Sequence, residues 1–168
     1  GDNLISIDAY FGDYLTTINL PGNTQSIEME FNTTNNYLYC LSKYSLYVVD
    51  PVINSLITTI SLTASLSSAS AFDLEINPIN GDVYVTYDNL PRVDIFAYNN
   101  LTSSPTTTLT PSSTNFPPSA NRTGKMVFND FEADMYITTD VDEVIRVNTT
   151  RDIQTTYGVT GLTHSIFY

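Results

Sequence analysis

The sequence predicts an all-β protein built from repeated four-stranded units, and three observations support this fold class. Residue types that favour strands are frequent, with 12 Tyr and 8 Phe among 168 residues. Short alternating segments are separated by turns rich in Asn, Gly and Pro. A pattern of strand, turn and strand also occurs three times along the chain. With 42% hydrophobic residues, a chain of this length can bury one sizeable core.

The first two strands of the unit form the clearest repeat. Residues 29–39 match residues 74–84 position by position, and a third copy lies at 126–136. Each copy consists of a strand, a polar turn and a second strand. A third strand is predicted at 46–50, with copies at 4–8, 93–97 and 144–148. A fourth strand is predicted at 57–62, with copies at 15–20, 106–109 and 154–157.

The unit therefore contains four short strands in about 42 to 52 residues, which is the size of a β-propeller blade. We predict a partial blade at 3–20, blades at about 26–62, 71–110 and 124–157, and a last strand at 164–168. Residues 103–121, where four Pro lie among Ser and Thr, are predicted to form an exposed insertion. Because both ends interrupt a unit, we expect a segment of a larger propeller, or a propeller completed by another chain.

Four pieces of this sequence resemble the YVTN-type repeats of seven-bladed propellers in bacterial and archaeal surface proteins. They are residues 74–78 (Leu-Glu-Ile-Asn-Pro), 81–86 (Gly-Asp-Val-Tyr-Val-Thr), 46–50 (Leu-Tyr-Val-Val-Asp) and 56–60 (Leu-Ile-Thr-Thr-Ile). The sequence departs from that family at Tyr87 and Asp88, which stand where the family usually has Asn. The resemblance implies a propeller fold and a surface location.

The charge of the chain excludes two classes of partner. It has 6 Lys and Arg against 18 Asp and Glu, a net charge of −12, and its basic residues are scattered. Nucleic-acid binding requires clustered cations, so we expect no nucleic-acid partner. The negative charge would also be repelled by an anionic membrane, and no apolar stretch is long enough to span one. The expected partners are therefore proteins or glycans.

Few residues in this sequence could carry out catalysis. Cys40 is the only cysteine and lies in an apolar run, where we predict a buried thiol. His164 is the only histidine, and no Gly-x-Ser-x-Gly motif accompanies it. We therefore predict no catalytic residues and a protein that is not an enzyme.

Acidic residues offer two candidate binding sites. Glu28, Glu30, Asp73 and Glu75 lie on the first strands of two units, and Lys125 occupies the Glu28 position in the third. Carboxylates lining a central channel could bind a cation or a cationic ligand, although we favour bonds to backbone N–H groups. Asp140, Asp142 and Glu143 form an acidic turn that could bind calcium, the one cofactor considered, although we favour a solvated turn.

Tyrosines and glycosylation sequons complete the candidate residues. Tyr39, Tyr84 and Tyr136 share one repeat position, which predicts packing between units, whereas other tyrosines could contact sugars or proteins. N-glycosylation sequons occur at Asn32, Asn100, Asn121 and Asn148, about the number that chance predicts for this composition.

We expect a non-catalytic scaffold or adhesive module of a secreted, cell-surface or virion protein. One alternative is a hydrolase or lyase fragment with an acidic central channel. The other is a subunit of an extracellular filament, or another homo-oligomer, completed by strand pairing between chains.

Overall fold

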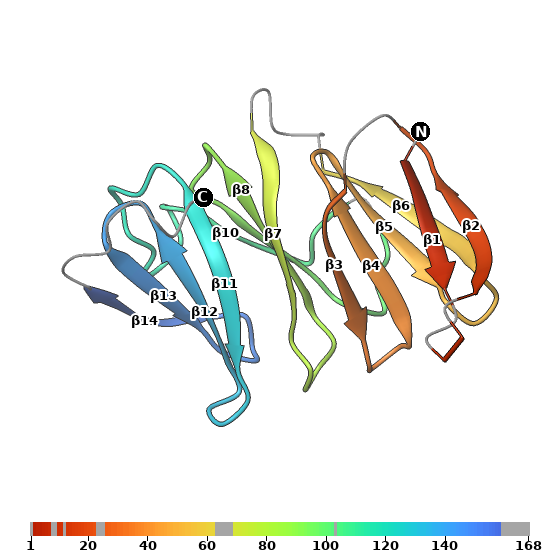
Figure 1. The fold of residues 1–168 in the computed structure, drawn as a ribbon. Helices are drawn as coiled ribbons and strands as arrows, with labels where there is room; N and C mark the ends of the chain where they lie inside the picture. The colour runs from red at the N-terminus through yellow and green to blue at the C-terminus, as the bar shows by residue number, and fades with distance from the viewer. Residues whose placement is uncertain are drawn as a thin grey trace.

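The computed structural model describes residues 2–7, 10–11, 13–22, 26–62, 69–102 and 104–158. These residues form fourteen strands in four antiparallel sheets and no helix (Figure 1). The first sheet contains β1 (Asp2–Ile7) and β2 (Tyr14–Leu20). The second contains β3 (Ser26–Asn32), β4 (Tyr37–Ser42), β5 (Ser45–Asp50) and β6 (Ser55–Ser61). The third contains β7 (Ser70–Ile76), β8 (Val83–Asp88), β9 (Val93–Phe96) and β10 (Thr107–Leu109). The fourth contains β11 (Thr123–Asn129), β12 (Asp134–Thr139), β13 (Glu143–Val147) and β14 (Ile153–Gly158).

Each four-stranded sheet is a meander in which every strand pairs with the next one along the chain. The all-β prediction is therefore confirmed, and the three four-stranded sheets span residues 26–61, 70–109 and 123–158. None of the sheets formed by the described strands is closed. No helix in the described part of the chain could span a membrane.

The two-stranded sheet has the same pairing as the third and fourth strands of the second sheet. Leu4 pairs with Ile18 on β1 and β2, and Leu46 pairs with Ile60, each 42 residues further on, on β5 and β6. A register shift also falls at equivalent places, after Ser6 in the first sheet and after Val48 in the second. The repeat therefore extends to the pairing of individual residues, and β1 and β2 correspond to the third and fourth strands of the second sheet.

Apolar side chains fill the spaces between consecutive sheets. One cluster, which includes Tyr39, Leu41 and Leu74, joins the second sheet to the third. Another, with Tyr84 and Met126, joins the third to the fourth. A smaller cluster joins β2 to the second sheet and contains Cys40.

The predicted burial of Cys40 is confirmed, and burial raises the pKa of its thiol to about 11. The thiol therefore stays protonated and unreactive at neutral pH.

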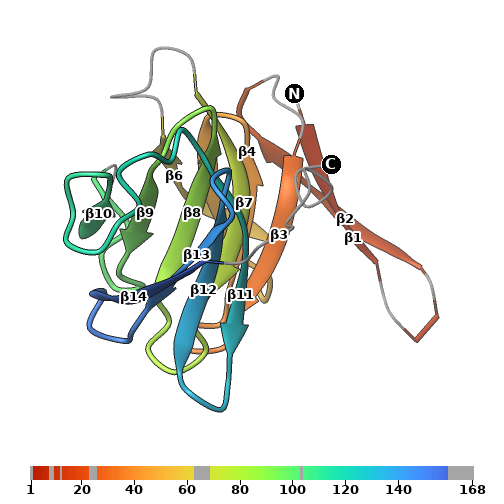
Figure 2. The ribbon, with the colours of Figure 1, turned by 90° about the vertical axis from the view of Figure 1, so that its left-hand side faces the viewer.

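The first strands of the three larger sheets lie side by side near the middle of the molecule. Strand β7 contacts both β3 and β11, and Figures 1 and 2 show the three strands adjacent to one another. Since consecutive sheets pack face to face, equivalent side chains on these three strands are brought within reach of each other.

The prediction of an exposed insertion at 103–121 is wrong for part of that segment. Phe116, Pro117 and Ala120 are buried, and Phe116 and Ala120 belong to the cluster between the third and fourth sheets. The Ser, Thr and Pro composition indicated an exposed loop, but one aromatic and one small apolar side chain are enough to anchor it. The last strand predicted at 164–168 lies outside the described residues, as does His164.

Candidate functional site

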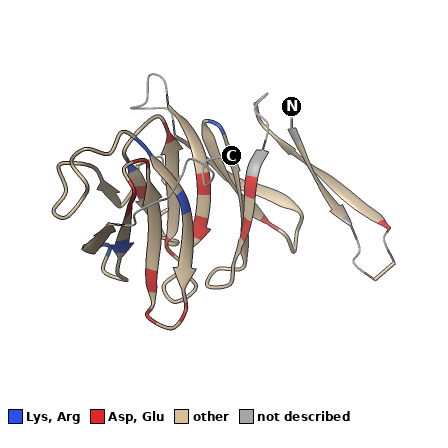
Figure 3. Cartoon of the chain, turned by 60° about the vertical axis from the view of Figure 1, so that its left-hand side comes forward, with Lys and Arg blue, Asp and Glu red and all other residues tan. Residues whose placement is uncertain are grey.

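Acidic and basic side chains of the first strands meet where the three sheets come together. Glu28 on β3, Asp73 on β7 and Lys125 on β11 occupy equivalent repeat positions. Figure 3 shows acidic and basic positions on neighbouring strands in the central part of the molecule. The structure therefore brings together three of the residues that the sequence analysis singled out.

Each acid in this group binds the backbone of the next first strand. A carboxylate oxygen of Glu28 accepts a hydrogen bond from the backbone N–H of Leu74, at 3.2 Å. One sheet further on, Asp73 accepts a hydrogen bond from the backbone N–H of Met126, at 2.6 Å. The same contact thus occurs twice, at equivalent positions, and it links consecutive sheets.

Lys125 takes the place of the acid in the fourth sheet and reaches back to both carboxylates. Its Nζ contacts Asp73 Oδ1 and lies 3.5 Å from Glu28 Oε2. The ammonium also lies 5.4 Å from the centre of the Phe72 ring. Although partial burial lowers the pKa of Lys125, its bonds with Asp73 and Glu28 outweigh that effect and raise it.

The pKa values of the carboxyl groups in this part of the molecule are raised. Burial raises the pKa of Glu75 to about 7, and the charges of Glu30 and Glu28 add to the increase. Burial and the charge of Glu28 also raise the pKa of Glu30. Burial and a hydrogen bond with Glu28 raise the pKa of Asp73, against the opposing effect of Lys125. Glu75 can therefore gain or lose a proton near pH 7.

The acidic turn that could bind calcium, at Asp140, Asp142 and Glu143, forms a hydrogen-bonded hairpin turn. Asp140 Oδ1 accepts hydrogen bonds from the backbone N–H groups of Asn121 and Arg122, at 2.9 and 3.3 Å. Asp142 has a φ of 56°, as a tight hairpin turn requires, and the carbonyl of Glu143 accepts a hydrogen bond from Thr139. Across the described residues, no three His, Cys, Asp or Glu side chains form a group that could hold a metal ion.

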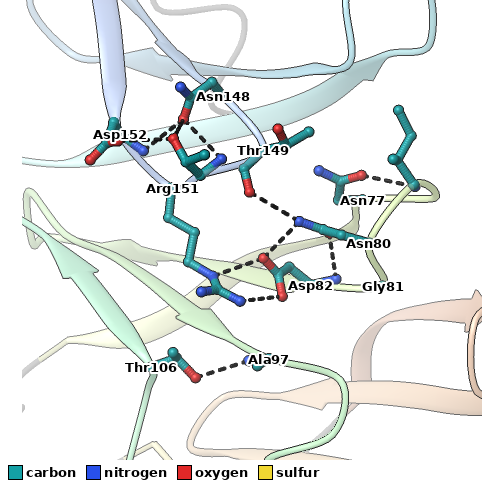
Figure 4. A network of polar contacts seen from close by, with 12 residues as sticks. Asn77, Asn80, Gly81, Asp82, Ala97, Thr106, Asn148, Thr149, Arg151 and Asp152 are labelled. Carbon is teal, nitrogen blue, oxygen red and sulfur yellow. Dashed lines mark hydrogen bonds and ion pairs between the residues drawn. The ribbon is translucent and has the colours of Figure 1, made fainter.

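A second polar network joins the third and fourth sheets and was not predicted from the sequence (Figure 4). Arg151, in the turn before β14, donates two hydrogen bonds of 2.8 Å to the carboxylate of Asp82. Asn80 donates to Asp82 and to the backbone carbonyl of Thr149. Asp82 is only 1% exposed, so Arg151 neutralises a fully buried charge. No sequence signal links the two ends of this ion pair, which lie 69 residues apart.

The sequons differ in accessibility. Asn32 is buried, and its side-chain amide donates a hydrogen bond of 2.9 Å to the carbonyl of Gly81. A glycan on Asn32 is incompatible with this contact, so the prediction of a site there is corrected. Asn100 and Asn121 are exposed, and Asn148 is partly exposed.

The tyrosines divide into buried and exposed sets. Tyr39 and Tyr84 are fully buried between sheets, whereas Tyr136, at the equivalent position, is only partly buried. At the turn of the β1 and β2 hairpin, Tyr10 is 94% exposed and Phe11 is 80% exposed. Figure 2 shows this hairpin extending away from the other sheets. Exposed aromatic rings at the end of a projecting hairpin are suited to contact with a partner.

No protein-family model matches this chain, and the search of curated proteins found no match.

Proposed function

We propose that the four sheets are consecutive blades of a β-propeller and that the protein is a non-catalytic scaffold or adhesive module. Consecutive four-stranded meanders that pack face to face, with their first strands together, support the propeller. The YVTN-like motifs at 46–50 and 74–86, together with a composition rich in Ser, Thr and Asn, favour a secreted, cell-surface or virion protein.

The contacts that the buried acids make support the non-catalytic part of this proposal. Asp73 and Asp82 each bind a basic side chain of the following sheet. Within the third sheet, Asp94 accepts hydrogen bonds from Tyr87, Arg92 and Thr108. Acids that act in catalysis face a cleft where a substrate can reach them, whereas these bind neighbouring strands.

The exposed aromatic hairpin supports the adhesive part of the proposal. The rings of Tyr10 and Phe11 are both largely exposed, and their centres lie 6.3 Å apart. Aromatic side chains contribute large contact areas in protein and sugar recognition. We expect the double substitution of Tyr10 and Phe11 by Ser to reduce binding to a glycan or protein array at least tenfold without lowering the melting temperature.

A hydrolase or lyase remains the second candidate, because Glu75 has a pKa of about 7 and lies near Glu30 and Glu28. The test is an assay of the chain with glycoside, ester and acidic polysaccharide substrates, alongside the Glu75→Gln variant. We expect no turnover from either protein. Turnover that disappears in Glu75→Gln would replace the scaffold proposal with an enzymatic one.

A further inference from the structure

A polar pocket lies where the last strand of the third sheet approaches the fourth sheet. Its volume is about 440 Å³, within the range of roughly 300–1,000 Å³ that small-molecule sites span. The walls come from β10, the loop that follows it, and the turn before β14, with Thr107, Leu109, Thr114, Arg151, Asp152 and Ile153 among the lining residues. Both sheets that form the pocket contain all four of their strands. The pocket is therefore a feature of two complete units.

Comparison with the preceding interface shows why the space is open to a ligand. In the third sheet, the connection from β9 to β10 spans residues 97–106, and its Leu101 packs against the apolar cluster between the second and third sheets. The equivalent connection in the fourth sheet, from β13 to β14, spans only residues 148–152. It presents Arg151 and Asp152 to the pocket in place of an apolar side chain. A shorter and polar turn thus replaces an apolar cover.

The walls of the pocket are held in position by contacts outside it. The side-chain amide of Asn115 donates a hydrogen bond of 3.1 Å to the carbonyl of Ile153, which ties the loop after β10 to β14. Phe116 anchors the same loop in the apolar cluster between the two sheets. Arg151 extends from its turn toward Asp82, to which it donates two hydrogen bonds (Figure 4). A ligand would therefore meet walls that are already ordered, which lowers the entropic cost of binding.

The rim of the pocket offers both donors and acceptors. Arg151 binds Asp82 through Nε and Nη2, and its Nη1 has no bond to any described residue. Asp152 is exposed, and its Oδ2 accepts a hydrogen bond of 2.9 Å from Thr150. The hydroxyls of Thr107 and Thr114 bind no other described side chain or backbone group, and each can donate and accept. This mixture suits a ligand that itself carries several hydroxyl groups.

The pocket also has an apolar part, formed by Leu109 and Ile153. Both side chains are buried and belong to the apolar cluster between the third and fourth sheets. A pyranose ring has C–H groups on its faces and hydroxyls around its edge, so it matches apolar side chains beside a polar rim. Small-molecule sites typically combine an apolar surface with a few polar groups that fix the orientation of the ligand.

The charges around the pocket favour a neutral ligand. The positive charge of Arg151 is already neutralised by Asp82, and Asp152 adds a negative charge at the rim. The chain as a whole carries a net charge of −12, which would repel an anion. A cation would be attracted by Asp152 but would face the guanidinium group of Arg151 at the same rim. Neither charged class of ligand is therefore matched by this pocket.

We propose that this pocket binds one neutral sugar residue of a glycan, with the ring against Leu109 and Ile153 and its hydroxyls bonded to Thr107, Arg151 and Asp152. The site is separate from the Tyr10 and Phe11 hairpin and goes beyond the proposed function, which assigns no ligand to the third and fourth sheets. It also gives Arg151 a second role besides its bond with Asp82.

The test measures binding of methyl glycosides of glucose, galactose, mannose and N-acetylglucosamine to the whole chain by NMR titration. We expect at least one of them to bind with a dissociation constant on the order of 1 mM, as a small polar ligand with few atoms should. The backbone amides of residues 107–114 and 151–153 should shift as the sugar is added. Glucuronic acid, glucosamine and inorganic phosphate serve as charged probes and should bind at least fivefold more weakly.

Three variants locate the binding. Asp152→Asn and Thr107→Val each remove one polar group from the rim, and we expect each to weaken sugar binding at least fivefold. The matched control is Asp130→Asn, which changes an exposed Asp in the turn between β11 and β12 and should leave binding unchanged. Since Asp152 and Asp130 are both exposed and Val suits a strand, all three variants should melt close to the wild type.

The inference would be overturned if none of the four glycosides shifted these amides, or if phosphate or either charged sugar bound more tightly than the neutral ones. Equal binding by the wild type, Asp152→Asn and Thr107→Val would also overturn it. Each of these results leaves the scaffold proposal intact, because that proposal is tested by turnover and by the Tyr10 and Phe11 substitutions. The double substitution of Tyr10 and Phe11 by Ser should not alter binding of the glycosides at this pocket.

Discussion

The turn between the first and second strands of each large sheet contains one residue with a positive φ. The three equivalent residues are Asn36, Gly81 and Ala133, with φ values of 60°, 74° and 61°. Asn and Gly tolerate this conformation, but the Cβ of Ala makes it unfavourable. The third copy of the turn therefore carries strain that the first two avoid.

We predict that Ala133→Gly stabilises the protein. Relief of the strained φ outweighs the greater entropy of Gly in the unfolded chain, for a gain of about 0.5–1 kcal/mol. Urea denaturation of the two proteins measures the change. The converse substitution, Gly81→Ala, should cost more than about 2 kcal/mol, since the new Cβ would also lie 2.8 Å from Thr34 Cβ. Equal and small effects of both changes would contradict the assigned turn conformation.

The raised pKa of Glu75 makes stability depend on pH. A carboxyl whose folded pKa lies above its unfolded value contributes stability below the unfolded value, and this contribution is lost as pH rises through the folded value. For Glu75 that window runs from about pH 4.5 to about pH 7. The wild type should therefore become less stable as pH increases through this range.

We predict that Glu75→Gln reduces this loss of stability. At pH 8 the variant should be more stable than the wild type by about 1 kcal/mol, a modest figure because Glu75 is only half-buried and solvent screens its charge. At pH 4 the difference should vanish. Melting temperatures of both proteins from pH 4 to pH 8 provide the test, and parallel pH profiles would show that Glu75 ionises normally.

At the scale of the elements, sheets are joined by side chains that bind the next sheet. Asn32 donates to the carbonyl of Gly81, Glu28 accepts from the N–H of Leu74, and Asp82 binds Arg151. The partners are between 46 and 69 residues apart. These contacts supplement the apolar clusters by fixing the position of one sheet against its neighbour.

The Arg151 and Asp82 pair should stabilise the contact between the third and fourth sheets. We predict that Arg151→Met costs about 2–3 kcal/mol, because it leaves the buried carboxylate of Asp82 without its cation. Asp82→Asn in the same background should recover part of this loss. The double-mutant cycle, measured by chemical denaturation, should give a coupling energy of about 1 kcal/mol or more, and additive effects would contradict a direct interaction.

The strands could be predicted from the sequence, but the side-chain contacts between sheets could not. The pattern of residues 29–39 and 74–84 is local, so it revealed each hairpin and its spacing. The repeat pattern places Lys125 at the position of Glu28, yet the contact of Lys125 with Asp73 depends on how the sheets stack. Arg151 and Asp82 carry no motif, and the burial of Phe116 depends on where a loop folds back. Contacts between repeats require three-dimensional information that the repeat pattern does not contain.

At the scale of the whole molecule, three sheets meet at one basic residue. Lys125 lies on β11 of the fourth sheet and contacts Asp73 of the third and Glu28 of the second. Asp73 also binds the backbone of Met126. The ammonium group thus stabilises an arrangement of acids that would otherwise repel one another at the centre of the molecule.

The consequence of removing this cation should depend on pH. We predict that Lys125→Met lowers the free energy of unfolding by about 2 kcal/mol at pH 8, where the side chain of Asp73 becomes a buried and unpaired carboxylate. At pH 5 the loss should be less than half as large, because Asp73 then binds a proton in the folded variant. Denaturation of both proteins at the two pH values tests this difference. A control variant, Lys43→Met, changes a lysine that lies over the Tyr44 ring and should alter stability equally at both pH values. If the loss in Lys125→Met were also equal, Lys125 would act through packing alone, and the charges of the three sheets would not be coupled through it.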